Sequence, residues 1–285
     1  MDFKHTAILI TASMIVLSIS GCAQRLSRSE RVATIPPEPE ANWEPVHPTQ
    51  VHSQRTVRLG SSVEGRPLDL TILGQGRPTI FIMAGIHGDE PNSVGVARAL
   101  LNYLKERSEL WAGGTIGILP AANPDGLTRQ RRTNVHKVDL NRNFPARNWK
   151  PAKSGELSRG PRPSSEPETR AIENAIRLLK PDCIVSIHAI SRGRVCNNYD
   201  GPARQLAVLL SRYNRYPPKA SIGYPTPGSF GSWAGVDQQI PTITLELPKG
   251  ASNEQCWEVN RAALLALIKV VTREKGSGGL MASDP

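Results

Sequence analysis

Apolar residues along the chain form two kinds of pattern, and the two kinds alternate. Buried β-strands are predicted where the chain has continuous apolar runs, at residues 79–84, 115–119, 182–187 and 242–247. Helices are predicted where apolar residues recur every three or four positions, over residues 92–106, 168–179, 203–212 and 253–271. In the first helix the recurring residues include Val96, Leu100 and Leu104. Pro91 suits its first turn, where no backbone N–H is needed.

Two weaker segments come before the first buried strand. Residues 57–59 and 68–73 alternate between apolar and polar positions, and Glu64-Gly65-Arg66 between them is typical of a turn. They predict a hairpin at the edge of the sheet. Because strands and helices alternate through the rest of the chain, the predicted fold class is α/β, with a single mixed sheet flanked by helices on both faces.

The first residues have the pattern of a targeting segment. Lys4 and His5 precede an apolar stretch over residues 7–19, which is short for a membrane span. The residues before Cys22, Leu-Ser-Ile-Ser-Gly, resemble a bacterial lipobox. This resemblance implies cleavage before Cys22, acylation of its thiol and attachment to a membrane. An ordinary secreted protein and an uncleaved anchor are the alternatives.

These features divide the chain into four parts. Residues 1–21 are predicted to be a lipoprotein signal peptide, and residues 22–50, which are rich in proline, an extended tether. Residues 51–273 are predicted to form one globular domain, followed by a disordered tail over residues 274–285. Ala23, directly after the lipobox cysteine, favours the outer membrane by the same resemblance. We therefore expect a lipoprotein of the bacterial cell envelope, on the outer membrane or facing the periplasm.

Charge and cysteine content narrow the function classes. The net charge is +10, and residues 128–170 alone hold eleven Lys and Arg against four Asp and Glu. Because this basic stretch has few aromatic residues and no nucleic-acid motif, we expect an anionic small substrate and no nucleic-acid partner. Cys183, Cys196 and Cys256 allow at most one disulfide, and the sequence does not choose the pair.

Two of the predicted strands are followed by a histidine. His87 comes just after the first buried strand and has Glu90 three residues later, while His188 follows the strand at residues 182–187. Because ligands bind at the carboxyl ends of parallel strands, these side chains are expected to meet. Two histidines and a glutamate form a known catalytic zinc set, with one zinc per chain. His136 and Asp139 have the same spacing but lie in a polar, basic stretch, and His188 alone would suit a core histidine.

Glu246 lies inside an apolar strand, where an unpaired carboxylate is costly. An outward-pointing strand residue is the simple interpretation. Beside a metal site, however, the same carboxylate suits a general base that takes a proton from an attacking water.

Several motifs occur in an order that resembles the zinc carboxypeptidases of the M14 type, over residues 55–270. They are His87-Gly-Asp-Glu90, Asn123-Pro-Asp-Gly126, Arg132-x-Asn134, Val138-Asp-Leu-Asn141-Arg142-Asn-Phe144, His188 and Glu246. The segment from Gly223-Tyr224 to Trp233 is most similar to the murein peptide amidase branch. That branch implies a metallopeptidase acting on the γ-D-glutamyl-diaminopimelate bond of cell-wall peptides.

The resemblance implies a role for each matched residue. His87, Glu90 and His188 would bind zinc, Glu246 would be the general base, and Arg132 would stabilise the oxyanion. Asn141 and Arg142 would hold the terminal carboxylate of the substrate, since the Arg fork matches a planar carboxylate. Tyr224 matches a mobile tyrosine that closes over the substrate. The oligomeric state stays open.

This chain departs from the family pattern at three places. Lys137 replaces a usual glycine and could alter substrate choice, and the neighbouring Arg129 and Arg131 leave the oxyanion assignment open between them and Arg132. Gly231 and Ser232 stand where larger carboxypeptidases line their side-chain pocket, which argues against a bulky apolar preference. An N-acyl amino acid deacylase of the succinylglutamate desuccinylase and aspartoacylase type and a catalytically silent binding protein are the alternative functions.

Overall fold

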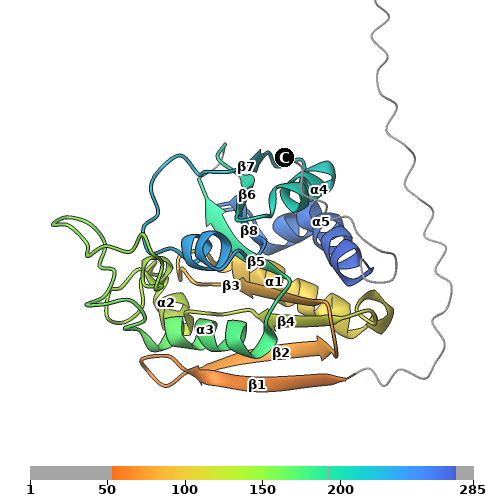
Figure 1. Cartoon of the computed structure of the whole chain (residues 1–285), viewed down its shortest axis with the longest axis horizontal. Coiled ribbons are helices and arrows are strands. Elements are labelled where there is room, and N and C mark those ends of the chain that lie inside the picture. Colours follow the sequence, from red (N-terminus) through yellow and green to blue (C-terminus); the bar gives the residue numbers. More distant parts are fainter. Residues whose placement is uncertain (1–52, 192, 274–285) are drawn as a thin grey trace, which may run out of the picture. The chain divides into compact units, whose positions relative to one another are not determined.

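The computed structural model describes residues 53–191 and 193–273 of the chain (Figure 1). The predicted signal peptide with Cys22, the tether and the tail lie outside the described residues. Among the described residues, no helix is both long and apolar enough to cross a membrane.

One mixed sheet of eight strands organises the described part of the chain, in the order β1-β2-β4-β3-β5-β8-β6-β7. The four central strands, β4, β3, β5 and β8, are parallel to one another. β2 runs antiparallel to both β1 and β4, while β6 runs antiparallel to β8 and parallel to β7. The strands are β1 Gln54–Ser61, β2 Pro67–Gly74, β3 Thr79–Ala84, β4 Thr115–Leu119, β5 Cys183–Ile190, β6 Cys196–Asp200, β7 Pro218–Lys219 and β8 Thr242–Pro248. The predicted edge hairpin is confirmed as β1 and β2.

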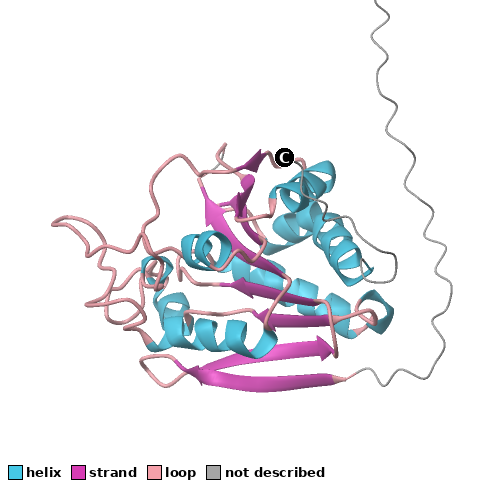
Figure 2. Cartoon of the chain, in the orientation of Figure 1, coloured by secondary structure: helices cyan, strands magenta, loops and turns pink. Residues whose placement is uncertain are grey.

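Helices cover both faces of the sheet (Figure 2), as the alternating pattern predicted. The helices are α1 Pro91–Lys105, α2 Pro124–Arg129, α3 Pro167–Leu179, α4 Arg204–Asn214 and α5 Asn253–Arg273, and short helical turns occur at Ser108–Leu110, Leu140–Arg142 and Gly231–Asp237. Helices α1, α4 and α5 pack on one face, and α3 with the Gly231–Asp237 turn packs on the other.

The apolar run of β3 follows from its central place. Ile80 and Ile82 belong to the core on the α1, α4 and α5 side, while Phe81 and Met83 belong to the core on the α3 side. Because side chains alternate across a strand, a strand that is covered on both faces is apolar at most of its positions. The same condition applies to β4 and β5, which explains why these strands could be recognised from sequence.

Two parts of the fold differ from the expectation. Asn123 to Gly126 was predicted as a turn, but it opens the short helix α2, in which the Asn123 side chain caps the N–H of Gly126 at 2.9 Å. Strand β6 and the turn Gly231–Asp237 were not predicted, because the sequence of β6, Cys-Asn-Asn-Tyr-Asp, is mostly polar. The three described cysteines, Cys183, Cys196 and Cys256, are buried free thiols.

Candidate active site

The turn after β3 places His87 and Glu90 at the carboxyl end of the sheet. Gly85 has φ 65°, a conformation that glycine adopts without strain. A Cβ on Gly88 would lie 2.0 Å from the carbonyl carbon of Gly126, so only glycine lets the turn pack against α2. The cap residue Asn123 also donates its side-chain N–H to the carbonyl of Ile86 at 3.3 Å. Helix α2 therefore supports the turn that carries His87.

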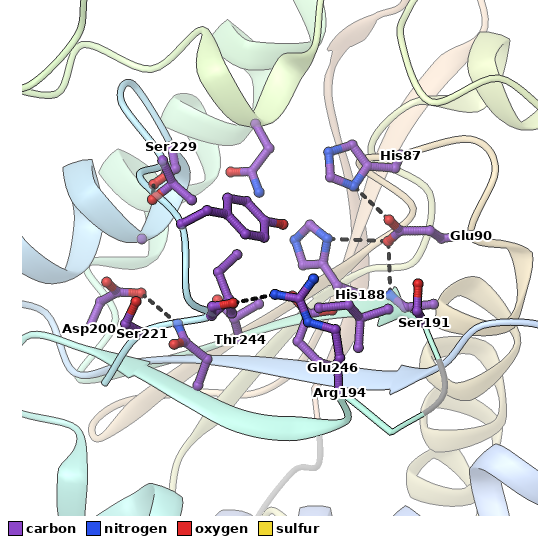
Figure 3. Close-up of a pocket in the computed structure, with 18 of the residues that line it drawn as sticks. His87, Glu90, His188, Ser191, Arg194, Asp200, Ser221, Ser229, Thr244 and Glu246 are labelled. Atoms are coloured by element: carbon purple, nitrogen blue, oxygen red, sulfur yellow. Dashed lines mark hydrogen bonds and ion pairs between the residues drawn. The ribbon is translucent and has the colours of Figure 1, made fainter. Parts of the chain in front are cut away.

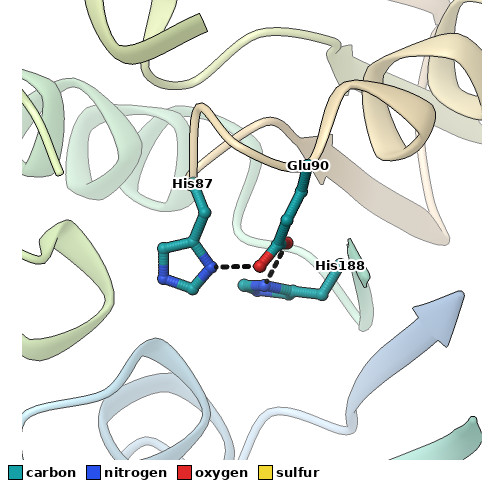
Figure 4. Close-up of side chains that lie close together, drawn as sticks. All are labelled: His87, Glu90 and His188. Carbon is teal, nitrogen blue, oxygen red and sulfur yellow. Dashed lines mark hydrogen bonds and ion pairs between the residues drawn. The ribbon is translucent and has the colours of Figure 1, made fainter. Parts of the chain in front are cut away.

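Three buried side chains converge at this point (Figure 4). Glu90 lies between two imidazoles, with Oε1 2.8 Å from Nδ1 of His87 and Oε2 3.2 Å from Nδ1 of His188. One ligand atom from each residue lies within 4.8 Å of the other two. The backbone N–H of Ala189 also donates to Oε2 of Glu90 at 2.9 Å, which orients the carboxylate. The predicted trio is thus brought together, and this donor set could hold a metal ion.

Asp139 orients His87 from the other side. Its Oδ1 lies 3.1 Å from Nε2 of His87, so an N–H at Nε2 leaves Nδ1 free to accept a metal. Burial lowers the pKa of His87, but the charges of Glu90 and Asp139 outweigh burial and raise it to about 9, so a metal that binds Nδ1 displaces a proton from it. The sequence did not reveal this role, because Asp139 was considered only together with His136, three residues before it. In the structure, His136 contacts Glu166 instead, at 2.7 Å.

Electrostatics within the trio favour a charged Glu90. Burial by itself raises the pKa of Glu90, yet the imidazoles of His87 and His188 hold it well below its ordinary value. The carboxylate is therefore ionised, as metal binding requires.

Glu246 lies beside the trio because of strand register. In the parallel pair of β5 and β8, His188 is the partner of Glu246. Glu246 is 6% exposed, and burial, together with the charge of Glu90, raises its pKa against the opposing effect of His188. A carboxylate with a raised pKa is a stronger base, which suits proton abstraction from water.

A cavity of about 300 Å³ opens over these residues (Figure 3). Its lining includes all of the predicted catalytic and substrate-binding residues: Glu246, Arg132, Asn141, Arg142 and Tyr224. Many of the remaining lining residues are polar or charged, among them Ser191, Arg194, Asn198, Asp200, Ser221, Thr226, Ser229 and Thr244. The cavity is therefore suited to a charged ligand more than to a bulky apolar one.

Among the neighbouring arginines, Arg132 is the one at the cavity. Its Nε donates to Oδ2 of Asp139 at 3.0 Å, and Nη1 lies 3.8 Å from Glu90. Arg129 turns away and donates to Glu64 at 2.6 Å, while Arg131 is exposed and does not line the cavity. Of the three arginines, Arg132 is therefore the one whose position suits the role that the sequence left open.

Asn141 and Arg142 lie together on the short helical turn that follows Asp139. The side-chain oxygen of Asn141 accepts the backbone N–H of Phe230 at 2.9 Å, which leaves its NH₂ group available to a ligand. Burial lowers the pKa of Arg142, although a guanidinium stays protonated at any ordinary pH. Tyr224 is 44% exposed at the cavity, and the Arg194 guanidinium lies 5.6 Å from its ring centre.

Two of the departures from the family pattern have structural outcomes. Lys137 has φ 60°, which explains why glycine is usual there, but its exposed side chain does not line the cavity. Gly231 does line the cavity, whereas the hydroxyl of Ser232 is taken by contacts with Ser229 and Thr226. The position of Lys137 therefore does not support a direct contact with the substrate.

Solved structures share this fold. The crystal structure of murein-tripeptide amidase from Escherichia coli O157 matches with a TM-score of 0.64 and 33% identity, over 76% of this chain and 93% of that chain. Bovine thrombin-activatable fibrinolysis inhibitor matches with a TM-score of 0.63 at 22% identity, over 77% and 88% of the two chains. Fold and site together define the class, a hydrolytic enzyme built on the zinc carboxypeptidase fold.

Sequence comparison gives the family. The model of the zinc carboxypeptidase family, peptidase M14, matches residues 46–201, and murein peptide amidase A of Escherichia coli K12 is 34% identical over 70% of this chain and 84% of its own length. The murein peptide amidase A of Vibrio campbellii is 32% identical over 74% and 86% of the two chains. The chain belongs to the zinc carboxypeptidase family. The residues matched by the family model end at position 201, before Tyr224 and Glu246. The structure places these two residues at the cavity.

Proposed function

We propose that this protein is a zinc-dependent peptidase that hydrolyses an amide next to a free carboxylate, at the γ-D-glutamyl-diaminopimelate bond of murein peptides. The observation that carries the proposal is the buried trio His87, Glu90 and His188, with Glu246 next to it in register. The murein peptide amidases similar to this chain support the choice of substrate.

In this proposal, the trio binds one zinc ion per chain. When bound, zinc supplies a Lewis acid and lowers the pKa of a water molecule from 15.7 to about 7. Asp139 fixes the imidazole ring through Nε2 of His87, so that Nδ1 points toward Glu90 and would be the atom that binds the ion.

Glu246 takes the proton as water attacks the amide carbonyl, and then delivers it to the leaving amine. Arg132 is a permanent cation 3.8 Å from Glu90, and it stabilises the negative charge that develops on the carbonyl oxygen. Because Asp139 holds its guanidinium at 3.0 Å, the arginine reorganises little during the reaction.

Asn141 and Arg142 bind the carboxylate that adjoins the cleaved amide. Arg142 offers a planar fork and Asn141 a free NH₂ group, and both face the cavity. Tyr224 is exposed at the same cavity and closes over the bound peptide. The several cations of the cavity suit a peptide with more than one carboxylate.

The test compares Glu246→Gln with the unchanged protein on L-Ala-γ-D-Glu-diaminopimelate. We expect the variant to keep zinc but lose turnover, because the amide cannot accept the proton. Glu254→Gln is the control, since Glu254 lies on α5 and does not line the cavity. Full activity of Glu246→Gln would remove Glu246 from the mechanism.

We also propose that the enzyme acts in the bacterial cell envelope as a lipoprotein anchored through Cys22. The lipobox-like residues before Cys22 support this. Labelling with a fatty-acid analogue tests it: the native chain should take up label, and Cys22→Ala should not. Equal labelling of both would refute the anchor.

A further inference from the structure

A strongly basic part of the surface is one long loop. Residues 147–162, which come before α3, contain five Lys and Arg and one acidic residue, Glu156. Lys137 lies beside this segment, because the neighbouring Val138 forms a β-bridge with Ser158. We call residues 147–162 together with Lys137 the basic loop.

Contacts within the basic loop fix its shape. The side chain of Arg159 is 11% exposed, donates to the carbonyl of Lys150 at 3.0 Å and pairs with Glu156 at 2.7 Å. The NH₂ group of Asn143 donates to the carbonyls of Arg159 at 2.7 Å and Arg162 at 3.0 Å. Arg159 is therefore a structural cation, and it neutralises the acidic side chain of the loop.

The other five cations of the basic loop face solvent. Lys137, Arg147, Lys150, Lys153 and Arg162 are all exposed, and among the described residues none of them forms an ion pair with an Asp or Glu. Like charges that gather on one surface repel one another, and a polyanion relieves this repulsion. The basic loop therefore offers a surface to an anionic partner.

The basic loop continues outward from one wall of the cavity. The side-chain oxygen of Asn148 accepts the backbone N–H of Gly228 at 3.0 Å, and its NH₂ group donates to the hydroxyl of Ser232 at 3.0 Å. Thr226 and Ser229, from the same segment as these two partners, line the cavity. A long ligand that enters the cavity can therefore extend over the basic loop.

The start of β1 lies on the far side of the sheet from this surface. Strand β1 is antiparallel to β2, which is antiparallel to β4, so β1 begins at the edge opposite to the carboxyl ends of the central strands. In Figure 1, the yellow-green loops project at one side of the sheet, and β1 begins at the other. An anchor that enters through β1 leaves the basic loop free for a partner other than the anchoring membrane.

The apolar and aromatic residues of the basic loop narrow the kind of polyanion. Leu157, 51% exposed, is the only exposed large apolar side chain among the described residues of the loop, and one leucine offers little area for insertion into a bilayer. Trp149 packs so closely on Gly228 that a Cβ there would lie 2.5 Å from its ring, so its ring is not a free platform for nucleic-acid bases. These features favour a polymer that carries carboxylates over a lipid surface or a nucleic acid.

We propose that the basic loop binds the carboxylate-bearing murein polymer outside the cavity and holds it while the cavity cleaves one of its peptides. The inference rests on the proposed function for the choice of this polymer, and it adds a second contact to the one made in the cavity. It predicts that the polymer is a better substrate than the free tripeptide, and that this advantage depends on the exposed cations.

The test measures binding to purified sacculi. The full-length protein carries Cys22→Ala, so that no acyl chain contributes, and Glu246→Gln, so that no peptide is cleaved. The loop variant combines Lys150→Gln, Lys153→Gln and Arg162→Gln. Since an exposed ion pair changes affinity by about 1.4- to 5-fold, the loss of three should weaken binding by about 3- to 100-fold. About 0.5 M salt should weaken binding of the parent protein in the same way, because it screens exposed charges.

The matched control combines Arg55→Gln, Arg204→Gln and Arg212→Gln, which removes the same number of charges. These three arginines are exposed on β1 and α4, outside the basic loop and the cavity. The control should bind sacculi as the parent protein does. Equal weakening in both triple variants would show that net charge alone decides binding, and would overturn the proposal.

Turnover separates the basic loop from the catalytic residues. With Glu246 restored, diaminopimelate release is followed from sacculi whose peptides end in diaminopimelate and from free L-Ala-γ-D-Glu-diaminopimelate. The loop variant should raise KM for sacculi by about 3- to 100-fold and keep kcat within about twofold. Its kcat/KM on the free tripeptide should stay within about twofold, because none of the three replaced residues lines the cavity. An equal loss on both substrates, or an unchanged KM for sacculi, would overturn the proposal.

Binding also distinguishes a failure of this inference from a failure of the proposed function. If neither substrate is cleaved, weaker sacculus binding in the loop variant alone keeps the basic loop as a polymer-binding surface and removes the proposed reaction. Absence of sacculus binding at low salt would overturn the inference, whatever the enzyme cleaves. Tighter binding to phosphatidylglycerol vesicles than to sacculi, at an equal concentration of anionic groups, would overturn it in favour of a lipid partner.

Discussion

Replacement of Asp139 by asparagine tests how the site prepares His87 for a metal. Asp139 is 2% exposed and is contacted by Nε2 of His87 at 3.1 Å, Nε of Arg132 at 3.0 Å and the backbone N–H of Asn141 at 3.0 Å. An asparagine has nearly the same shape, but its single oxygen can replace either Oδ1, which accepts from His87 and Asn141, or Oδ2, which accepts from Arg132. Its NH₂ group must then face another donor, either the imidazole or the guanidinium.

The expected fall in zinc affinity follows because asparagine lacks both the negative charge and the second acceptor oxygen of Asp139. Loss of such an outer partner of a metal-binding histidine weakens metal affinity by about 10- to 100-fold, or about 1.4–2.7 kcal/mol. Because Arg132 loses the same partner, kcat with saturating zinc should fall as well, by a further factor of about ten or more.

The assay is a zinc titration of the Asp139→Asn variant against a competing chelator of known affinity. Asp182→Asn is the matched control, since Asp182 also accepts a backbone N–H, from Thr79 at 2.8 Å, and pairs with Arg77, but lies outside the cavity. The control should lose stability and keep zinc affinity. Unchanged zinc affinity in a folded Asp139→Asn variant would refute the role given to Asp139.

Two further predictions concern stability. Gly88→Ala should lower the free energy of unfolding by about 2 kcal/mol or more in a urea titration. Its Cβ would lie 2.0 Å from the backbone of Gly126, and overpacking of this kind costs about 1–3 kcal/mol. Gly65→Ala is the control for the backbone cost alone, because its Cβ would meet no atom within 4 Å while φ is 79°. An equal loss in both variants would contradict the close packing. The folded-state pKa of Asp200 is raised to about 6, so its contribution to stability is fully present below about pH 4 and is lost as the pH rises through 6. Asp200→Asn should therefore match the unchanged protein at pH 4 and be more stable by about 2–3 kcal/mol at pH 7, and a difference that is constant with pH would show that Asp200 titrates normally.

Central strands and their ends could be predicted from sequence because burial on both faces leaves little freedom. Strand β3 is apolar from Ile80 to Ala84, so His87 and Glu90, which follow it closely, were expected at the sheet edge where ligands bind. His188 followed from the same argument on β5, whereas Glu246 was recognised as a carboxylate inside the apolar strand β8. The one-to-one register that pairs them could not be predicted, since it is set by neighbouring strands.

Residues whose roles depend on tertiary contacts were missed. Asp139 lies in an irregular basic stretch, and only the folded chain brings it to His87, fifty-two residues away in sequence. A polar residue placed by a partner far along the chain leaves no periodic signal.

The proposed murein peptidase activity depends on a zinc ion held by His87, Glu90 and His188. The most direct measurement determines zinc per chain in the full-length protein and follows diaminopimelate release from L-Ala-γ-D-Glu-diaminopimelate with and without a chelator. We expect about one zinc per chain, as a three-ligand catalytic site holds, and release that stops with the chelator and returns with zinc. A folded protein that binds no zinc, or release that the chelator does not affect, would contradict the account.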